Sequence, residues 1–131
     1  MICPVCKESM VILELSEVEI DYCTGCNGIW LDSGELELLL EDVEEREKLL
    51  NTLTTDSVHP EKPYHCPICN KKMEKVHVGE NKDVLIDRCI KGHGLWFYKG
   101  ELNAVLELGA DEDNKVLNLL KEIFENKLSS N

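Results

Sequence analysis

Aromatic residues are scarce in this sequence, making up 5% of its 131 residues, with only two phenylalanines and two tryptophans. No apolar run approaches the length of about 18 residues that a membrane span requires. No apolar targeting segment follows Met1, because a Cys-Pro pair occupies residues 3–4. We therefore expect a small cytoplasmic protein whose segments bury too little apolar surface to fold without a metal or covalent cross-link.

Basic residues are also few. The chain has 14 lysines and arginines against 26 acidic residues, a formal net charge of -12, and the phosphates of nucleic acids repel such a protein. Residues 1–62 carry four basic and 15 acidic side chains, whereas residues 63–131 carry 10 and 11. Within residues 63–100 the balance is basic, seven to four. An anion-binding surface is therefore expected only in the second half.

Cysteine, in contrast, follows a pattern that occurs twice. A Cys-Pro-x-Cys motif opens each copy, at residues 3–6 and 66–69, and a second pair of metal donors follows after a predicted hairpin. Each copy supplies four sulfur or nitrogen donors, the number that a tetrahedral zinc ion requires. We therefore predict two zinc ions. The eight candidate ligands are Cys3, Cys6, Cys23 and Cys26 in the first copy and Cys66, Cys69, Cys89 and His93 in the second.

Several alternatives to this assignment remain. Disulfides would leave one of the seven cysteines unpaired and suit a secreted chain. The four-cysteine site also fits rubredoxin-like iron, or a thiol redox pair, although the βαβ context of such a pair is absent. In the second copy, His65 or His77 is an alternative nitrogen ligand to His93. Four protein ligands leave no position for a reacting water, so we predict no enzymatic activity.

The segments between the cysteines predict β-hairpins. Alternating residues predict strands over 11–15 and 18–22 in the first copy, and over 74–78 and 84–88 in the second. The hairpin carries the chain from one cysteine turn to the next, as in a zinc ribbon. Trp30 and Trp96 stand at equivalent places after the ribbons and are predicted to cover them.

A helix is predicted after each ribbon. Asp32 and Glu35 have the form of a capping box, and leucines at helical spacing continue through Leu53. Tyr98 replaces the capping aspartate in the second copy, so the box is expected to be lost there. The later elements and limits that we predict are a helix over 101–108, a final helix over 111–128, a polar linker over 54–63, and two units over 1–53 and 64–131.

These motifs resemble the prokaryotic transcription factor IIB-type zinc finger, the transcription factor zinc-finger family. The shared pattern is Cys-Pro-x-Cys, a hairpin, Asp-x-Cys-x2-Cys-x-Gly-x-Trp-Leu-Asp and Gly-Glu-Leu. The first copy matches it from Cys3 to Leu36, while the second, from Cys66 to Leu102, departs at the fourth ligand and at residues 97–98. The resemblance implies a small α+β fold with two zinc ribbons, each followed by a helix, and an extra C-terminal helix. It says little about activity, because a fold does not fix function.

The leading functional hypothesis is a protein-interaction or adaptor module, self-associating through its leucine stripes. The alternative is a nucleic-acid-binding or transcription-related factor that uses the basic second ribbon, since aromatic and basic residues interleave there. A weaker hypothesis is zinc storage or sensing. The candidate nucleic-acid contacts are Arg88, Lys91, Phe97, Tyr98 and Lys99.

Overall fold

The computed structural model describes residues 1–15, 17–40, 43–56 and 64–109. Both predicted hairpins are confirmed at their predicted limits. The described elements are β1 (Val11–Leu15), β2 (Val18–Tyr22), β3 (Ile29–Asp32), α1 (Glu35–Leu39), α2 (Val43–Leu50), β4 (Thr54–Asp56), β5 (Glu74–Val78), β6 (Val84–Arg88), β7 (Gly94–Phe97) and α3 (Glu101–Gly109).

The strands of both repeats join in one antiparallel sheet of order β1-β2-β3-β7-β6-β5-β4. The junction is the pairing of β3 with β7, in which Trp30 lies directly opposite Trp96. Trp30 and Trp96 are also the equivalent residues of the two repeats. The repeats are therefore related by an approximate twofold axis through this pair, in the manner of an isologous dimer within one chain.

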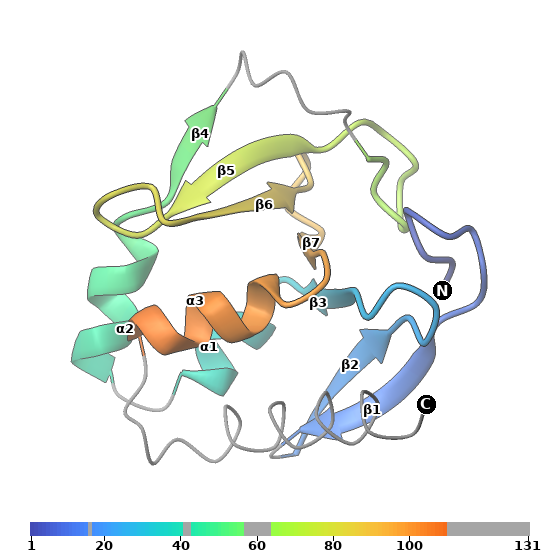
Figure 1. Ribbon diagram of the computed structural model, residues 1–131, viewed down its shortest axis with the longest axis horizontal. Coiled ribbons are helices and arrows are strands. Elements are labelled where there is room, and N and C mark those ends of the chain that lie inside the picture. Colours follow the sequence, from blue (N-terminus) through green and yellow to red (C-terminus); the bar gives the residue numbers. More distant parts are fainter. Residues whose placement is uncertain (16, 41–42, 57–63, 110–131) are drawn as a thin grey trace.

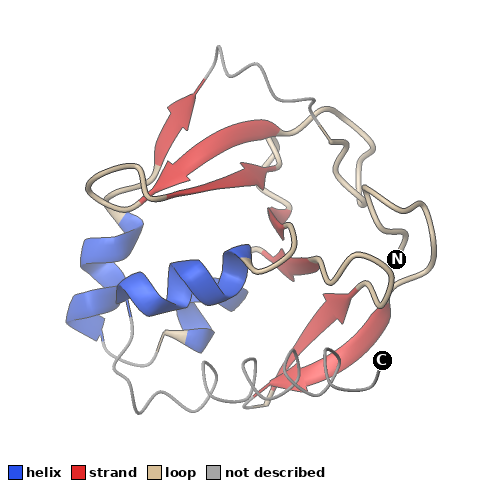
Figure 2. Cartoon of the chain, in the orientation of Figure 1, coloured by secondary structure: helices blue, strands red, loops and turns tan. Residues whose placement is uncertain are grey.

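The sheet separates two hydrophobic clusters. On one face, Ile20, Ile86 and Phe97 pack with leucines of all three helices, and Figures 1 and 2 show the helices gathered inside the curve of the sheet. On the other face the two tryptophans pack with methionines and with cysteines of both repeats. Because a strand alternates its side chains between faces, one sheet serves both clusters.

The helix after the first ribbon differs from the prediction of one helix through Leu53. The structure has two helices, α1 and α2, and Leu40 between them is extended, with φ -93° and ψ 98°. This conformation allows both Leu39 and Leu40 to be fully buried, which adjacent residues on a helix of this kind rarely achieve. The acidic residues that follow would also repel one another at i, i+3 and i, i+4 spacing in a continuous helix.

Each repeat has one of the two contacts of a capping box, the one made by the glutamate side chain. Gly34, in the left-handed region at φ 91°, precedes α1 and provides no side-chain cap, so Asp32 is not the N-cap that was predicted. The Glu35 carboxylate nevertheless accepts a hydrogen bond from the Asp32 N–H, and Glu101 accepts one from the Tyr98 N–H. The prediction that the box is lost at Tyr98 is therefore wrong for this contact, because its donor is the backbone.

The predicted linker begins with a strand. Thr54–Asp56 forms β4 and pairs with β5, so these residues belong to the sheet. Residues 57–63 of the predicted linker lie outside the described residues. The final helix predicted over 111–128 also lies outside the described residues. The shorter helix is confirmed as α3. Within the part of the chain that the structure describes, no helix combines the length and hydropathy needed to cross a membrane.

Candidate metal centres

The first centre brings together the four cysteines of the first repeat. The sulfurs of Cys3, Cys6, Cys23 and Cys26 all lie within 4.8 Å of one another. The Cys3 and Cys26 sulfurs are 3.7 Å apart, which is close to the edge of a tetrahedron of sulfurs placed about 2.3 Å from a central zinc ion. All seven cysteines are free. The geometry therefore fits a metal ion and not a disulfide framework.

Backbone N–H groups orient these thiols. The Val5 and Cys6 N–H groups point at the Cys3 sulfur, at N···S distances of 3.4 and 3.2 Å. The turn closes through a hydrogen bond from the Cys3 N–H to the Glu8 carbonyl and requires Lys7 at a positive φ of 64°. Such donors favour a thiolate, which is the form that binds zinc.

The second centre brings His93 to three cysteines. The sulfurs of Cys66, Cys69 and Cys89 and a ring nitrogen of His93 lie within 4.8 Å of one another. The Cys69 and Cys89 sulfurs are 3.7 Å apart, and His93 Nδ1 is 3.4 Å from the Cys89 sulfur. His77 instead binds Asp56, at an Nε2···Oδ2 distance of 2.9 Å.

The turn before β7 explains how a histidine occupies a cysteine's place. In the first repeat the Cys23 N–H donates to the Gly28 carbonyl, and in the second the Cys89 N–H donates to the Gly94 carbonyl, so both turns have the same span. Gly92, at φ 80°, stands where the first repeat has Cys26. The donor therefore moves one residue along, and the longer imidazole side chain reaches the same place.

The surroundings shift the pKa values of the Cys26, Cys66 and Cys89 thiols in opposite directions. Burial raises the pKa of Cys66 to about 11. Burial also raises that of Cys26, with the nearby sulfurs of Cys23 and Cys3 acting in the same direction. At Cys89 burial is outweighed by the backbone N–H groups of His93 and Lys91, which lower the pKa to about 6. A central dication removes this conflict, because it stabilises all of the thiolates at once.

The two centres are coupled through the tryptophans. A Cβ placed on Gly28 would lie 2.3 Å from Cη2 of Trp96, and one on Gly94 would lie 2.7 Å from Cζ2 of Trp30. Each tryptophan therefore packs where the other repeat has a glycine. The Ser33 N–H also donates to the His93 carbonyl, at 3.0 Å. The Gly-x-Trp motif thus joins the repeats, a role that sequence reasoning missed because the contact crosses from one repeat to the other.

A sequence profile described as "Transcription factor zinc-finger" matches residues 2–42 and 65–108. The chain belongs to the transcription factor zinc-finger family. The two matched regions contain all eight candidate ligands, and the paired centres fit two zinc ions. Comparison with curated proteins and with solved structures finds no match.

The two zinc-finger repeats differ in how their charges are compensated. Asp87 is 3% exposed and pairs with Lys75 at 3.0 and 3.1 Å. In the first repeat the equivalent Asp21 lies opposite Ile12 instead of a lysine. Burial raises the pKa of Asp21, and the carboxylates of Asp32 and Glu19 raise it further, while the positive N-terminal amino group acts in the opposite direction. The zinc-side face of the first repeat is therefore acidic and internally repulsive.

The five residues predicted to contact nucleic acid do not form one surface. Phe97 is 1% exposed within the helix-side cluster, so its predicted contact is incompatible with its burial. Arg88 binds the Glu74 carboxylate and the Thr55 hydroxyl. Lys91, Tyr98 and Lys99 are exposed. Tyr98 stacks on Tyr64, at a centroid distance of 6.4 Å, a partner that the sequence analysis did not identify.

Proposed function

We propose that this chain is a non-enzymatic cytoplasmic adaptor, whose two zinc centres hold one sheet that binds a partner protein. The ligands in this proposal are the eight side chains predicted from the sequence, in repeats spanning 1–53 and 64–131. Four protein side chains at each centre leave no open coordination position, which supports a structural and not a catalytic role for the metal.

The observation that carries the interaction proposal is the outer edge of β1. Both ends of the described sheet are edge strands, β1 at one end and β4 at the other. The short β4 covers β5, the counterpart of β1 in the second repeat, whereas β1 has no second neighbour among the described strands. Val11 and Ile12 on this strand are 45% and 66% exposed. An exposed apolar edge strand is a ready template for an added strand.

The charge around this edge specifies the partner. Glu14 lies opposite Glu19 and Ile12 lies opposite Asp21, so these side chains share one face. Residues 1–62 as a whole have 15 acidic and four basic side chains. A partner strand with basic residues next to apolar ones would relieve this repulsion and gain association rate.

Self-association through the leucine stripe has less support than the sequence implied. Leu36, Leu39 and Leu40 of that stripe are at most 2% exposed, because they pack beneath the sheet. The stripe is therefore used within the chain, and the proposed interface is the sheet edge instead.

The test is affinity capture from the native cell with the zinc-loaded chain and two matched variants. Ile12→Lys places a charge on the edge strand, and Leu38→Lys makes the same change at an α1 residue that is also 66% exposed. We expect a protein partner to be recovered with the wild type and with Leu38→Lys, but not with Ile12→Lys. Recovery of the same proteins by all three, or of nucleic acid alone, would contradict the proposal.

A nucleic-acid role is the second candidate, favoured by the second repeat. The stacked pair Tyr64 and Tyr98 lies in the repeat that carries the exposed Lys91 and Lys99, and aromatic platforms beside lysines bind single strands. Titration with single-stranded and duplex DNA and RNA at rising salt tests it. Affinity that falls steeply with salt and is lost in Tyr98→Ala supports this role, while no binding at low salt excludes it.

A further inference from the structure

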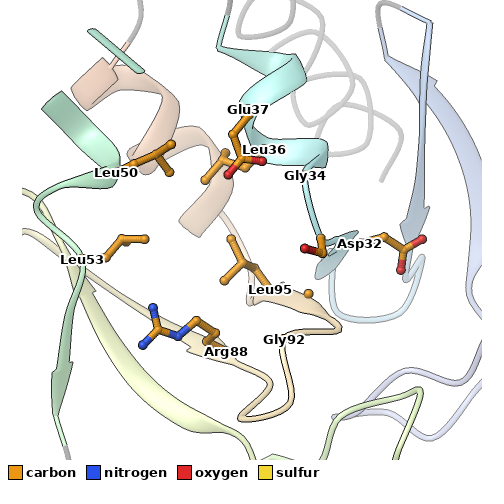
Figure 3. A pocket seen from close by; sticks show the side chains of 11 residues that line it. Asp32, Gly34, Leu36, Glu37, Leu50, Leu53, Arg88, Gly92 and Leu95 are labelled. Carbon is orange, nitrogen blue, oxygen red and sulfur yellow. The ribbon is translucent and has the colours of Figure 1, made fainter. Parts of the chain in front are cut away.

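A small cavity lies where the two repeats meet on the helix side of the sheet (Figure 3). Its volume is about 170 Å³. The first repeat contributes the end of β3, α1, the end of α2 and the segment that follows it, and the second contributes β6, β7 and the turn that contains Gly92. The cavity therefore exists only because the repeats share a sheet.

Four leucines form the apolar part of the cavity wall. Leu36 is fully buried, whereas Leu50, Leu53 and Leu95 are half-buried and pack at the margin of the helix-side cluster. A volume of about 170 Å³ is below the range of cofactor and drug sites. It is close to that of cavities of about 150 Å³ that hold one benzene ring. One large apolar side chain therefore fits it.

The charges at the cavity are not equally satisfied. Arg88 is held by Glu74 at 2.7 Å and by Thr55 at 2.9 Å, so its charge is compensated within the chain. Glu37 Oε2 is buried and has no hydrogen-bond partner among the described residues. Asp32 also lines the cavity. Arg46 donates to the backbone carbonyl of Glu37, at 3.3 Å, and not to Oε2. Among the described residues, the charged group that lines the cavity without an ion-pair partner is therefore negative.

We propose that this cavity, named here the leucine pocket, receives an apolar side chain of a partner protein whose neighbouring residue is lysine or arginine. This inference rests on the proposed adaptor function and adds a second contact to it. The apolar group gains burial against the four leucines, and the cation pairs with Glu37 at Oε2, the oxygen that has no hydrogen-bond partner among the described residues. The chemistry selects the partner segment by size and by charge.

The test uses the zinc-loaded full chain and the blocked peptide acetyl-Gly-Leu-Lys-Gly-amide, followed by ¹H–¹⁵N NMR. We expect roughly millimolar affinity, with shifts centred on the amides of Ser33, Gly34, Gly92 and Leu95. Replacing leucine by serine in the peptide should weaken binding about tenfold or more. Replacing lysine by glutamate should weaken it about fivefold.

Two protein variants locate the binding. Leu53→Trp fills the pocket and should abolish the shifts, whereas Leu38→Trp, the same change at an exposed leucine, should leave them unchanged. Glu37→Gln should keep the preference for leucine over serine but remove most of the preference for lysine over glutamate.

Three results would overturn the proposal. They are the absence of any shift at these amides at tens of millimolar peptide, binding that survives Leu53→Trp, and equal affinity for the lysine and glutamate peptides. Dimers that form with concentration and disappear in Leu53→Trp would assign the pocket to a second copy instead. If the peptide does not bind the pocket but partner capture still depends on Ile12, this inference alone is refuted and the proposed adaptor function is not.

Discussion

The two repeats share their metal geometry and their central strands but differ in the residues around them. Residues that lie directly opposite one another on neighbouring strands allow the two repeats to be compared position by position. On the first side it runs from Trp30 through Asp21 to Ile12, and on the second from Trp96 through Asp87 to Lys75. The aspartate is present on both sides, but only the second has a lysine directly opposite it. At Asp21 the positive N-terminal amino group is the opposing charge, and Ile12 stands where the second repeat has Lys75.

The tryptophans differ in the same way. The Trp30 indole N–H donates to Asp32 Oδ1 at 2.8 Å. Tyr98 stands at the equivalent place in the second repeat, and the buried Trp96 N–H has no hydrogen-bond partner among the described residues. An unsatisfied buried N–H costs about 1–3 kcal/mol. Tyr98, in place of an aspartate, therefore leaves the Trp96 N–H unsatisfied among the described residues at a cost in stability.

The largest expected effect comes from the metal centres. His93→Ala should reduce the bound zinc from two ions to one, and a structural zinc ion contributes on the order of 10 kcal/mol to folding. Native mass spectrometry gives the stoichiometry. Amide hydrogen exchange should rise at Ser33, whose N–H binds the His93 carbonyl. Two tightly held zinc ions in this variant would show that His93 is not a ligand, and Cys26→Ser is the matched change at the first centre.

The next effect separates the two aspartates. Asp87→Asn leaves the buried Lys75 charge without its partner and should lower the free energy of unfolding by about 3–5 kcal/mol. Asp21→Asn removes a carboxylate that has no lysine opposite it and should change stability by less than about 0.5 kcal/mol. Urea unfolding at saturating zinc measures both. Equal decreases in the free energy of unfolding would show that the two carboxylates contribute equally to stability, whether or not a lysine lies opposite.

Local patterns were enough to predict the hairpins and the ligands. Alternation over 11–15 and 18–22 reflects contacts within one hairpin, and the cysteine spacing reflects one turn at a time. The strands β3 and β7 were missed because each has four residues and finds its central partner in the other repeat. Such short segments show no alternation to read.

The break between α1 and α2 was missed for a related reason. No glycine or proline interrupts the leucine spacing between Leu36 and Leu53, so local propensity predicts one helix. The sheet overrides that propensity by burying Leu39 and Leu40 together. The leucine pocket could not be predicted either, since its walls come from segments that only the shared sheet brings together.

Substitution of the glycines at the contact between the repeats should lower stability by an intermediate amount. A Cβ on Gly94 would lie 2.2 Å from the Leu31 carbonyl oxygen, a backbone atom, whereas one on Gly28 would meet the Trp96 ring at 2.3 Å. We expect Gly94→Ala to cost about 3 kcal/mol, and Gly28→Ala somewhat less because a ring can shift. Gly25→Ala, whose nearest contact is 3.4 Å, is the control. Thermal unfolding of the zinc-loaded variants tests the order, and a harmless Gly94→Ala would contradict the cross-repeat packing.

The smallest effect concerns the carboxylates at the two helix starts. Burial raises the pKa of Glu35 above its ordinary value of 4.5, and the carboxylates of Asp32, Asp21 and Glu19 raise it further, although its hydrogen bond from the Asp32 N–H acts the other way. A raised pKa means that the folded state binds the proton more tightly, so this group lowers stability as the pH rises above about 4.5.

Glu35→Gln keeps the acceptor for the Asp32 N–H and removes the charge. After allowance for solvent screening, we expect it to stabilise the chain at pH 7 by a few tenths of a kcal/mol. The gain should shrink as the pH falls toward 4.5 and disappear below it, where the wild-type carboxyl is protonated in both states. Glu101→Gln is the matched change beside the neutral Tyr98, where no such gain is expected. The urea midpoints of the three zinc-loaded proteins across this pH range test the prediction. A stability gain that is independent of pH, or equal in Glu35→Gln and Glu101→Gln, would show that charge repulsion within the first repeat does not cause the gain.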